Sequence, residues 1–419
     1  MNVLLLGADG FLGRHLQIAL ETAGHTVRRG VHRPVRRADE IAVDYARDVD
    51  PGAWRGRLTG VDAVINTVGI LREGRGRRFD AIHDQAPRAL FAACRETGVR
   101  RVIQVSALGA DTRAASRFHL SKRAADDYLG TLDLEWVIVQ PAFVYGLDGA
   151  SSRMFRQIAS LPLLPVPGSG QQLIQPIHID DLCLAMVRLL VPGAASRRRI
   201  PLVGPAALTY RDYLCALRAG MGLGSAPVLS MPAGLMRASA WIGERVPGAV
   251  LTRENLAMLE RGNTANVAMT ETLLGRGPRP VATFIAPQEA MLLAREARLG
   301  WLLEILRVSL AVVWIGSGVV SLGLYPVARS LDLLAAVGLT GTPALAALYL
   351  LSLFDIAMGL MVLCMRGTWL WGVQILVVLG YTLVVTAALP ELWLHPFGPV
   401  LKNLPILAGL MLLVYLERR

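Results

Sequence analysis

Long stretches without a charged residue dominate the sequence beyond residue 300. A helix needs about 20 residues to cross a hydrocarbon core of about 30 Å, and three stretches are long enough: Val308–Ala328, Leu333–Phe354 and Gly367–Pro390. Two shorter stretches, Leu392–Leu401 and Asn403–Leu416, follow. We therefore expect residues 300–419 to form an all-α bundle of four transmembrane helices, the fourth short and interrupted by proline, rather than a soluble bundle.

Most of the charge precedes residue 300. The chain has 43 basic and 32 acidic residues, a net charge of +11. No aromatic residues are interleaved with the basic ones, so a nucleic-acid partner is not expected. The four cysteines stand apart without disulfide or metal-ligand spacing, which favours a reducing compartment and no metal.

Arginine in the predicted connections indicates the orientation in the membrane. Met1–Leu6 runs straight into glycines and has no basic n-region, so we expect a strand rather than a signal peptide. With the N-terminal domain in the cytoplasm, the inner side holds Arg295, Arg298, Arg366, Arg418 and Arg419, and the outer side holds Arg329 and Lys402. We expect a multi-pass protein of the cell inner (cytoplasmic) membrane with both termini cytoplasmic.

Residues 1–205 alternate short apolar runs with helical stretches. This alternation predicts an α/β Rossmann-like fold, a doubly wound parallel sheet with helices on both faces. The expected strands are Val3–Leu6, His25–Val31, Ile41–Val43, Val61–Thr67, Val99–Val105 and Trp136–Val139, with helices starting near Gly10, Asp84 and Ser121.

Residues 206–299 lose the strand signal, and we expect a small mixed lobe that closes over the ligand. Its expected helices are Thr209–Met221 and Thr252–Leu259. Gln157–Ile179 is free of charge but rich in proline and glycine, so it is expected to be a loop. Arg72–Arg78 and Arg197–Arg199 are expected to be solvated loops, with contact to an anionic lipid surface as the alternative.

A glycine-rich turn follows the first strand and opens a helix. The turn reads Gly7-Ala8-Asp9-Gly10-Phe11-Leu12-Gly13. Gly7 and Gly10 have no Cβ, so a pyrophosphate can approach the helix N-terminus, whose free amides and dipole favour negative charge. Gly13 lets the helix pack on the sheet. In this strand-turn-helix context the turn predicts a dinucleotide site.

The end of the second strand distinguishes NADP from NAD. A basic residue there binds the 2′-phosphate of NADP, and an acidic one binds the ribose diol of NAD. The sequence reads Arg28-Arg29-Gly30-Val31-His32-Arg33, which favours NADP(H), with Arg33 as the expected contact and His32 or Arg29 as alternatives. Asp44 and Tyr45 either border the adenine or form a plain turn.

The GxxGxxG spacing resembles atypical short-chain dehydrogenases/reductases, near the NmrA-like and complex I accessory-subunit-like NAD(P)-binding proteins. Four further segments support this resemblance: Asn66–Gly69, Val105–Ala110, Gln140–Gly146 and Pro176–Asp181. The resemblance implies cofactor contacts from Thr67, Val68, Gly69, Pro141 and Phe143. The tail resembles the DoxX-like membrane domain at Trp393–Pro399 and Lys402–Pro405, and fusion of these two modules is a known bacterial arrangement.

In catalytic members of that superfamily, a serine orients the carbonyl, a tyrosine gives the proton, and a lysine lowers the tyrosine pKa and holds the ribose. Ser106 and Lys122 match these positions, but Phe118 stands in the place of the tyrosine. Loss of a general acid typically costs about 10²–10⁴-fold in rate. Ordinary ketone reduction and sugar epimerisation are therefore not expected.

Hydride transfer to a quinone depends less on that acid, because the first product is a stabilised phenolate. The leading hypothesis is an NADPH-dependent oxidoreductase acting on a lipophilic acceptor, a quinone or an isoprenoid-like molecule, beside membrane lipids. The alternative is a catalytically silent NAD(P)H-binding sensor or assembly factor for a respiratory or lipid enzyme. His119 and Tyr145 are the remaining groups able to supply a proton, and both are more easily explained as structural.

Charged residues near the apolar tail suggest local pairs. Asp355 interrupts the apolar stretch Leu333–Met365, where it is expected to pair with Arg307, to be protonated, or to serve a proton or substrate role. Glu304 is also expected to pair with Arg307. In the N-terminal part, His178, Asp180 and Asp181 are expected to start a helix rather than to bind metal.

Overall fold

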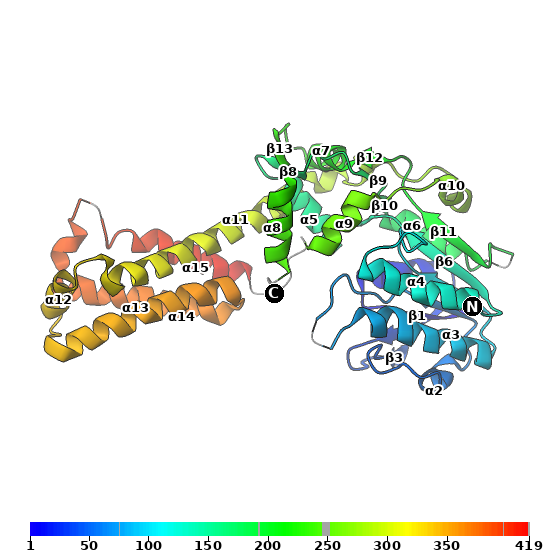
Figure 1. The fold of residues 1–419 in the computed structure, drawn as a ribbon, viewed down its shortest axis with the longest axis horizontal. Helices are drawn as coiled ribbons and strands as arrows, with labels where there is room; N and C mark the ends of the chain where they lie inside the picture. Colours follow the sequence, from blue (N-terminus) through cyan, green and yellow to red (C-terminus); the bar gives the residue numbers. More distant parts are fainter. Residues whose placement is uncertain (75, 192, 245–251, 397, 418–419) are drawn as a thin grey trace. The chain divides into compact units, whose positions relative to one another are not determined.

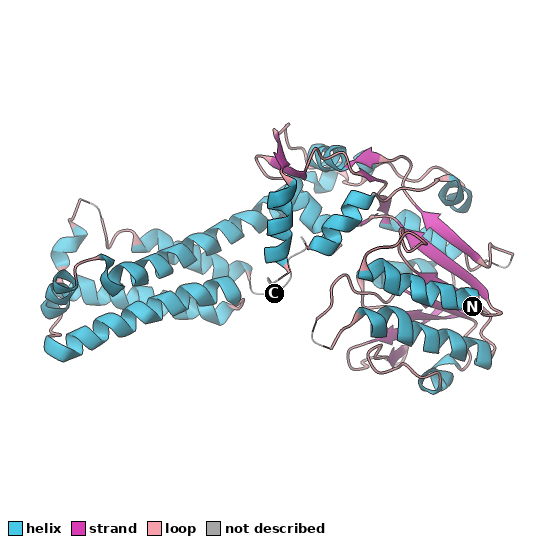
Figure 2. Cartoon of the chain, viewed as in Figure 1, coloured by secondary structure: helices cyan, strands magenta, loops and turns pink. Residues whose placement is uncertain are grey.

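A computed structural model of the 419-residue chain describes residues 1–74, 76–191, 193–244, 252–396 and 398–417. The chain divides into two compact units, Met1–Ala297 and Arg298–Arg419. Figures 1 and 2 show the α/β character of the first unit and the purely helical character of the second.

The N-terminal unit contains a seven-stranded sheet in which every pairing is parallel. Its strands, in spatial order, are β11 (Arg198–Leu202), β6 (Glu135–Pro141), β5 (Arg101–Val105), β4 (Ala63–Asn66), β1 (Asn2–Leu6), β2 (Thr26–Val31) and β3 (Glu40–Ala42). The predicted doubly wound Rossmann-like sheet is thereby confirmed, because the strand order reverses direction beside β1.

Helices cover both faces of the sheet because successive residues of a strand point to opposite sides. Val3 and Leu5 of β1 pack against α1 (Phe11–Thr22) and α6 (Ile179–Arg188), whereas Leu4 and Leu6 pack against the other layer. That layer consists of α2 (Gly52–Arg55), η1 (Gly56–Leu58), α3 (Ala86–Thr97) and α4 (Arg117–Gly130).

Two of the predicted helix starts were too late. A π-helical turn, η2 (Asp80–Gln85), runs directly into α3, so the helix begins before Asp84. Helix α4 begins at Arg117 rather than near Ser121, because the Ser116 hydroxyl accepts the backbone N–H of His119 and caps the helix.

Two expected loops contain strands. Arg198 and Arg199 begin β11, whose backbone pairs with β6, so the expected solvated loop at Arg197–Arg199 was wrong. The expected loop at Gln157–Ile179 was also wrong: it contains β8 (Leu164–Pro167), β9 (Leu173–Ile174) and β10 (Ile177–His178). Their partners are distant in the sequence, namely β13 (Val228–Met231), β12 (Leu208–Thr209) and β7 (Val144–Tyr145). The other arginine-rich stretch, 72–78, holds an isolated bridge between Gly74 and Arg77, and its Arg75 lies outside the described residues.

A second hydrophobic core lies beyond the sheet and includes Phe155, Tyr213 and Phe284. The helical elements of this region are α5 (Ala150–Ala159), α7 (Tyr210–Gly220), α8 (Ala233–Gly243), α9 (Arg253–Arg261), α10 (Ala268–Leu274) and η3 (Val281–Thr283). Helices α7 and α9 begin where expected, since Thr209 and Thr252 cap them with their hydroxyls.

The C-terminal unit is helical. Its elements are α11 (Pro287–Val319, which starts before residue 298), η4 (Val320–Leu324), α12 (Val327–Ala336), α13 (Gly341–Cys364), α14 (Thr368–Ala388), η5 (Pro390–Trp393) and α15 (Asn403–Leu416). Three segments are long and apolar enough to cross a membrane: Pro287–Leu324, Gly341–Cys364 and Thr368–Ala388. Helix α15 is apolar but shorter.

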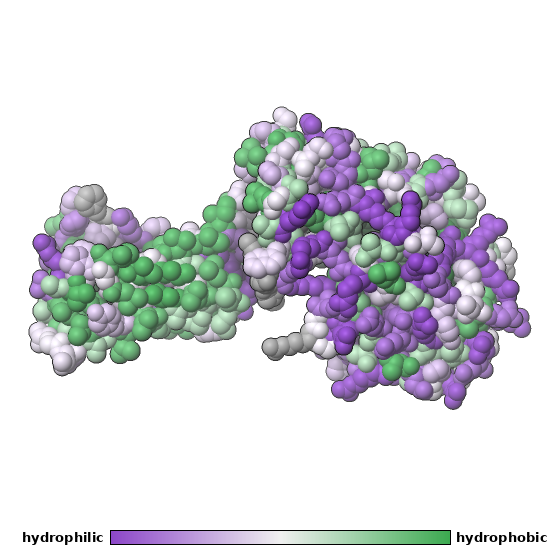
Figure 3. Space-filling model, viewed as in Figure 1, coloured by the Kyte–Doolittle hydropathy of each residue, from purple (hydrophilic) through white to green (hydrophobic). Residues whose placement is uncertain are grey.

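Large apolar side chains cover the outside of this unit. Leu350, Leu376 and Leu383 are each about 70% exposed, and Figure 3 shows a continuous hydrophobic surface over these helices. An apolar exterior of this extent is typical of helices in contact with lipid.

The expected second span, Leu333–Phe354, was wrong. It joins the end of α12 to most of α13, although Gly338 and Gly341 have positive φ angles between the two helices. Helix α13 continues past Asp355, whose carboxylate accepts a hydrogen bond from the Tyr381 hydroxyl of α14 at 3.2 Å. The charge-free run ends at Phe354, but the helix continues beyond it, so the end of the run did not mark the end of the helix.

Arg307 does not pair with Asp355. Its guanidinium is 4% exposed, donates to Glu417 Oε1 at 2.8 Å and lies over the Trp371 ring. Glu304 lies 3.8 Å from Arg307, as expected, but 2.7 Å from Arg366. Arg418 and Arg419, on which the predicted orientation partly depends, lie outside the described residues.

Candidate dinucleotide site

The glycine-rich turn is a tight connection between β1 and α1. Gly7 has φ +80°, and a Cβ there would lie 2.8 Å from Thr67 Oγ1. The Gly10 N–H donates to the Gly7 carbonyl at 2.9 Å. A Cβ at Gly13 would lie 2.1 Å from the same carbonyl oxygen, so only glycine allows the helix to approach the turn this closely.

The first turn of α1 is suited to an anion. No side chain among the described residues caps this helix at Gly10, and its first turn contains no acidic residue. The first amides of a helix have no partner within the helix. The amides of Phe11, Leu12 and Gly13 are therefore available to a phosphate. The ring of Phe11 packs against Gly146 and Gly149.

A cavity of about 900 Å³ opens beside this turn, at the carboxyl ends of β1, β2, β3 and β4. Ligands of open parallel sheets bind at this edge. Nine of the predicted site residues line the cavity: Gly7, Asp9, Gly10, His32, Asp44, Tyr45, Thr67, Val68 and Gly69. The sequence reasoning missed Arg47 and Arg77, which also line it. Arg47 lies two residues after Tyr45, so its position in the loop after β3 could have predicted that it lines the cavity.

The arginines after β2 are already paired. Arg29 is 7% exposed and donates to Asp39 and Glu40, so it has no free charge for a phosphate. Arg33 bonds to Glu40 at 2.6 Å and lies 3.2 Å from Asp9. These arginines, Arg33 first, lower the pKa of Glu40 to about 2.

Tyr45 is structural rather than free for a ligand. Its side chain is buried, and its hydroxyl donates to Asn66 Oδ1 at 2.8 Å. Burial raises the pKa of Tyr45 well above its ordinary value. Asp44 accepts the Ala46 N–H at 3.0 Å and remains partly exposed in the cavity. Asp44 therefore both forms a turn after β3 and lines the cavity.

Lys122 and Ser106 do not line the 900 Å³ cavity, although Lys122 lies against Gly69, which does. Lys122 is 4% exposed, and its Nζ donates to the carbonyls of Val68 and Val105 at 3.2 and 3.0 Å. A Cβ at Gly69 would lie 3.1 Å from that Nζ. Ser106 donates its hydroxyl to the buried Asp126, one helical turn after Lys122 on α4. Asp126 was not predicted, although its spacing from Lys122 placed both on one helix face.

Pro141 and Phe143 do not line the 900 Å³ cavity. The Pro141 carbonyl accepts the Leu108 N–H at 3.1 Å. The Phe143 N–H donates to Asn263 Oδ1 at 3.0 Å, and the Asn263 amide also donates to the Leu108 carbonyl. These contacts join the loop after β5 to the loop after β6.

Phe118 occupies an aromatic cluster in place of a proton donor. It is buried one turn before Lys122, with its ring against Phe79 and edge-on to His83. His83 Nε2 accepts the Ile70 N–H at 3.0 Å, so the neutral ring carries its proton on Nδ1, toward Ser121. Burial lowers the pKa of His83 to about 2, and the ring stays neutral.

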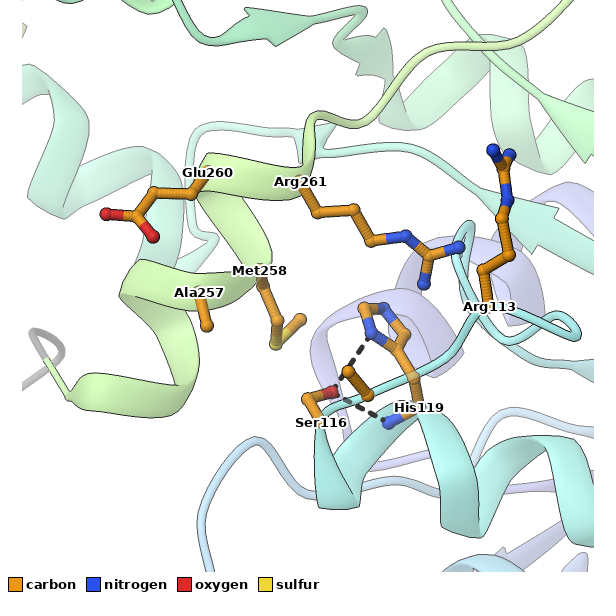
Figure 4. Close-up of a pocket in the computed structure, with 8 residues that line it drawn as sticks. Arg113, Ser116, His119, Ala257, Met258, Glu260 and Arg261 are labelled. Atoms are coloured by element: carbon orange, nitrogen blue, oxygen red, sulfur yellow. Dashed lines mark hydrogen bonds between the residues drawn. The ribbon is translucent and has the colours of Figure 1, made fainter.

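A second cavity, of about 550 Å³, lies between the N-terminus of α4 and helix α9 (Figure 4). His119 lies at its edge and bonds to the Ser116 hydroxyl at 3.0 Å. Arg261 donates to both oxygens of Asp111 at 2.6 Å. Burial, followed by Arg261, lowers the pKa of His119.

His178, Asp180 and Asp181 start α6, as expected. The His178 side chain accepts the Asp180 N–H and caps the helix. Asp181 is fully buried and pairs with Arg276. Tyr145 stacks on Phe284 in the second hydrophobic core.

Comparison with known proteins matches both parts of the chain. Residues 7–156 match the NAD(P)H-binding family, and residues 311–411 match the DoxX-like family. The ceramide reductase of Caulobacter vibrioides is 31% identical over 190 residues, covering 44% of this chain and 59% of the relative. Mitochondrial NADH dehydrogenase (ubiquinone) 1 alpha subcomplex subunit 9 of Arabidopsis thaliana is 29% identical over 220 residues, covering 50% and 55%. The chain thus spans little more than half the length of these curated relatives.

Solved structures share the fold of the N-terminal unit. A nucleoside-diphosphate-sugar epimerase from Staphylococcus aureus has a TM-score of 0.56 at 17% identity, covering 68% of this chain and 99% of that one. UDP-glucuronic acid 4-epimerase from Bacillus cereus, in complex with NAD, has a TM-score of 0.52 at 17% identity, covering 70% and 100%.

Fold and site together define a Rossmann domain that binds a nicotinamide coenzyme. The N-terminal part of the chain contains an NAD(P)H-binding domain, and the C-terminal part contains a DoxX-like domain. The DoxX-like match and the three long apolar helices associate the chain with a membrane. The glycine turn and the uncapped start of α1 fit the pyrophosphate of such a coenzyme.

Proposed function

We propose that this protein is a membrane-anchored, NADP(H)-dependent oxidoreductase that transfers a hydride to a lipophilic acceptor such as a quinone. The observation that carries the proposal is the uncapped glycine turn opening on the 900 Å³ cavity, with the buried ammonium of Lys122 against Gly69 of its lining. A bound reduced coenzyme supplies a hydride. Lys122 would hold the nicotinamide ribose, and Ser106 would orient the acceptor.

The choice of acceptor rests on Phe118. A ketone reduced to an alkoxide needs a strong general acid, whereas a quinone leaves a stabilised phenolate. The aromatic cluster around Phe118 offers no hydroxyl, and His83 presents an unprotonated Nε2 to the Ile70 N–H. An acceptor with a stabilised product is therefore favoured. The likeness to a ceramide reductase and to a subunit of NADH dehydrogenase (ubiquinone) supports a lipid-soluble acceptor.

NADP(H) is favoured over NAD(H) because the rim of the cavity is basic. Arg33 follows His32 at the end of β2, and Arg47 and Arg77 line the cavity. Arg33 is 31% exposed, so a 2′-phosphate can reach its guanidinium while Glu40 retains part of it. We further propose that the chain crosses the cell inner membrane several times with both termini in the cytoplasm, the side favoured by Arg295, Arg298 and Arg366.

A direct test is NADPH oxidation by the detergent-extracted full chain with soluble quinone analogues. Gly10→Asp places a carboxylate at the helix N-terminus, where the Cβ alone would lie 3.1 Å from the Gly7 carbonyl oxygen. This variant should lose coenzyme binding and turnover. Gly56→Asp is the matched control, because nothing lies within 4 Å of a Cβ there. If the wild-type protein shows no turnover with any acceptor, the proposed enzymatic activity is contradicted.

The second candidate is a catalytically silent NAD(P)H-binding sensor or an assembly factor for a respiratory or lipid enzyme. Phe118 at the tyrosine position and the likeness to a complex-associated subunit favour it. It predicts NADPH binding by wild type, loss of binding in Gly10→Asp, and no acceptor-dependent oxidation. Calorimetric measurement of NADPH binding, together with the turnover assay, distinguishes the oxidoreductase from the silent binding protein.

A further inference from the structure

Asp126 is a buried carboxyl group below the expected nicotinamide site. It lies on α4, is fully buried, and accepts the Ser106 hydroxyl at Oδ2. Its other oxygen, Oδ1, has no hydrogen-bond partner among the described residues. A buried carboxylate normally needs several donors or a cation, because loss of hydration is costly. This environment favours the uncharged acid.

The neighbouring charges do not neutralise Asp126 directly. Lys122 is one turn earlier on the same helix, but its Nζ donates to two backbone carbonyls. Arg199 of β11 forms an ion pair with Asp127, the next residue of α4. Burial raises the pKa of Asp126, and it lowers the pKa of Lys122.

Ser106 connects Asp126 to the carboxyl edge of the sheet. It follows β5 directly, and its N–H donates to the Val139 carbonyl at 2.8 Å, which fixes the backbone. The hydroxyl bonds to the α4 carboxyl, and Ser106 stands at the edge of the sheet where parallel-sheet ligands bind. When Asp126 is protonated, its O–H can donate to Ser106, and the Ser106 hydroxyl is then free to donate to an acceptor.

We propose that Asp126 supplies, through Ser106, the proton that the missing tyrosine gives in related enzymes. The inference rests on the proposed oxidoreductase function. As a hydride and its two electrons reach the acceptor, the Ser106 proton passes to the acceptor oxygen and the Asp126 proton passes to Ser106 Oγ. The oxidised coenzyme, the reduced acceptor and the Asp126 carboxylate remain. The carboxylate takes up a proton from water through Ser106 after the product leaves.

The other titratable groups near Phe118 are less suited to this role. The His83 ring is bonded at both nitrogens, to Ile70 and Ser121. His119 bonds to Ser116 at the separate 550 Å³ cavity. Asp126 is the carboxyl group that touches the serine of the site.

A first experiment needs no coenzyme. Infrared titration of the detergent-extracted protein detects the C=O stretch of a protonated carboxylic acid. We expect such a band at pH values where exposed carboxyl groups are ionised, its loss in Asp126→Asn, and its retention in the matched control Asp127→Asn. A spectrum that is the same in wild type and Asp126→Asn would overturn the proposal, whatever the acceptor.

A second experiment measures single-turnover oxidation of bound NADPH by a quinone analogue in H₂O and in D₂O. Asp126→Asn and Ser106→Ala should slow hydride transfer by about 10²-fold, the low end for a general acid. They should also remove the solvent isotope effect and the fall in rate at high pH, where wild-type Asp126 is ionised, while Asp127→Asn changes none of these. Unchanged NADPH affinity would show that the variants fold.

The outcomes separate the two hypotheses. If wild type turns over and Asp126→Asn keeps the wild-type rate and pH profile, the proton route is wrong and the enzyme stands. If wild type has no turnover but the infrared band is present and lost in Asp126→Asn, the proposed function fails, and with it the proton route that rests on that function.

Discussion

Gly13→Ala tests the central element of the site, the close contact between α1 and the glycine turn. The added Cβ would lie 2.1 Å from the Gly7 carbonyl oxygen and 2.7 Å from the Ala8 Cα. Both neighbours are backbone atoms, so a side-chain rotation cannot relieve the contact and α1 must move.

The magnitude follows from two opposing terms. Overpacking a rigid contact costs up to about 3 kcal/mol, and replacing glycine by alanine inside a helix returns about 1 kcal/mol. The free energy of unfolding should therefore fall by about 2 kcal/mol. The Tm of a unit of this size falls by roughly 2–4 °C for each kcal/mol of lost stability, so Tm should fall by about 4–8 °C. NADPH affinity should fall as well, because the displaced helix carries the amides that face the pyrophosphate.

Thermal unfolding of the full chain with and without NADPH, together with calorimetric titration, measures both effects. Gly234→Ala is the control, since this helical glycine of α8 is exposed and nothing lies within 4 Å of a Cβ there. It should leave coenzyme affinity unchanged. Wild-type Tm and NADPH affinity in Gly13→Ala would refute the assignment of this turn as the coenzyme site.

Three further changes test other parts of the site. Arg33→Ala should weaken NADPH binding about 10-fold, the effect of one charged hydrogen bond of about 1.5 kcal/mol, and should spare NADH; equal losses for both coenzymes, by calorimetry, would count against the NADP preference. Phe118→Tyr restores a hydroxyl one turn before Lys122, so reduction of a soluble ketone should appear in an NADPH oxidation assay, and its absence would argue against this position as that of the tyrosine. The lowered pKa of Glu40 means that its pairing stabilises the fold above about pH 4.5 and is lost as pH falls toward about 2. Tm measured against pH should therefore fall less steeply in Glu40→Gln than in wild type over that window, and parallel curves would contradict the pairing.

Local patterns predicted the parts of the protein whose contacts are close in sequence. The strand, turn and helix from Asn2 to Thr22 could be read directly, because a glycine turn and its helix start within a few residues. The apolar helices were likewise visible, since membrane insertion depends on composition over about 20 residues. The extension of α13 past Asp355 escaped notice, because Asp355 is accommodated by Tyr381, which lies on a different helix.

Contacts between distant segments account for what the sequence did not reveal. Strand β11 exists because β6 pairs with it across about 60 residues of chain. Arg29 and Arg33 looked like free cations in the sequence, and the folded chain gives them Glu40 as a shared partner. Asp126 owes its burial to the folded chain, and its hydrogen-bond partner Ser106 lies 20 residues earlier.

Composition and short-range spacing were thus sufficient for the class of fold, the glycine-rich turn and the presence of long apolar helices, because those depend on neighbouring residues. Burial and the partner of each charged group depend on which segments the sheet and the helices bring together. That assembly determines which arginines remain available to a phosphate and which carboxyl group can hold a proton.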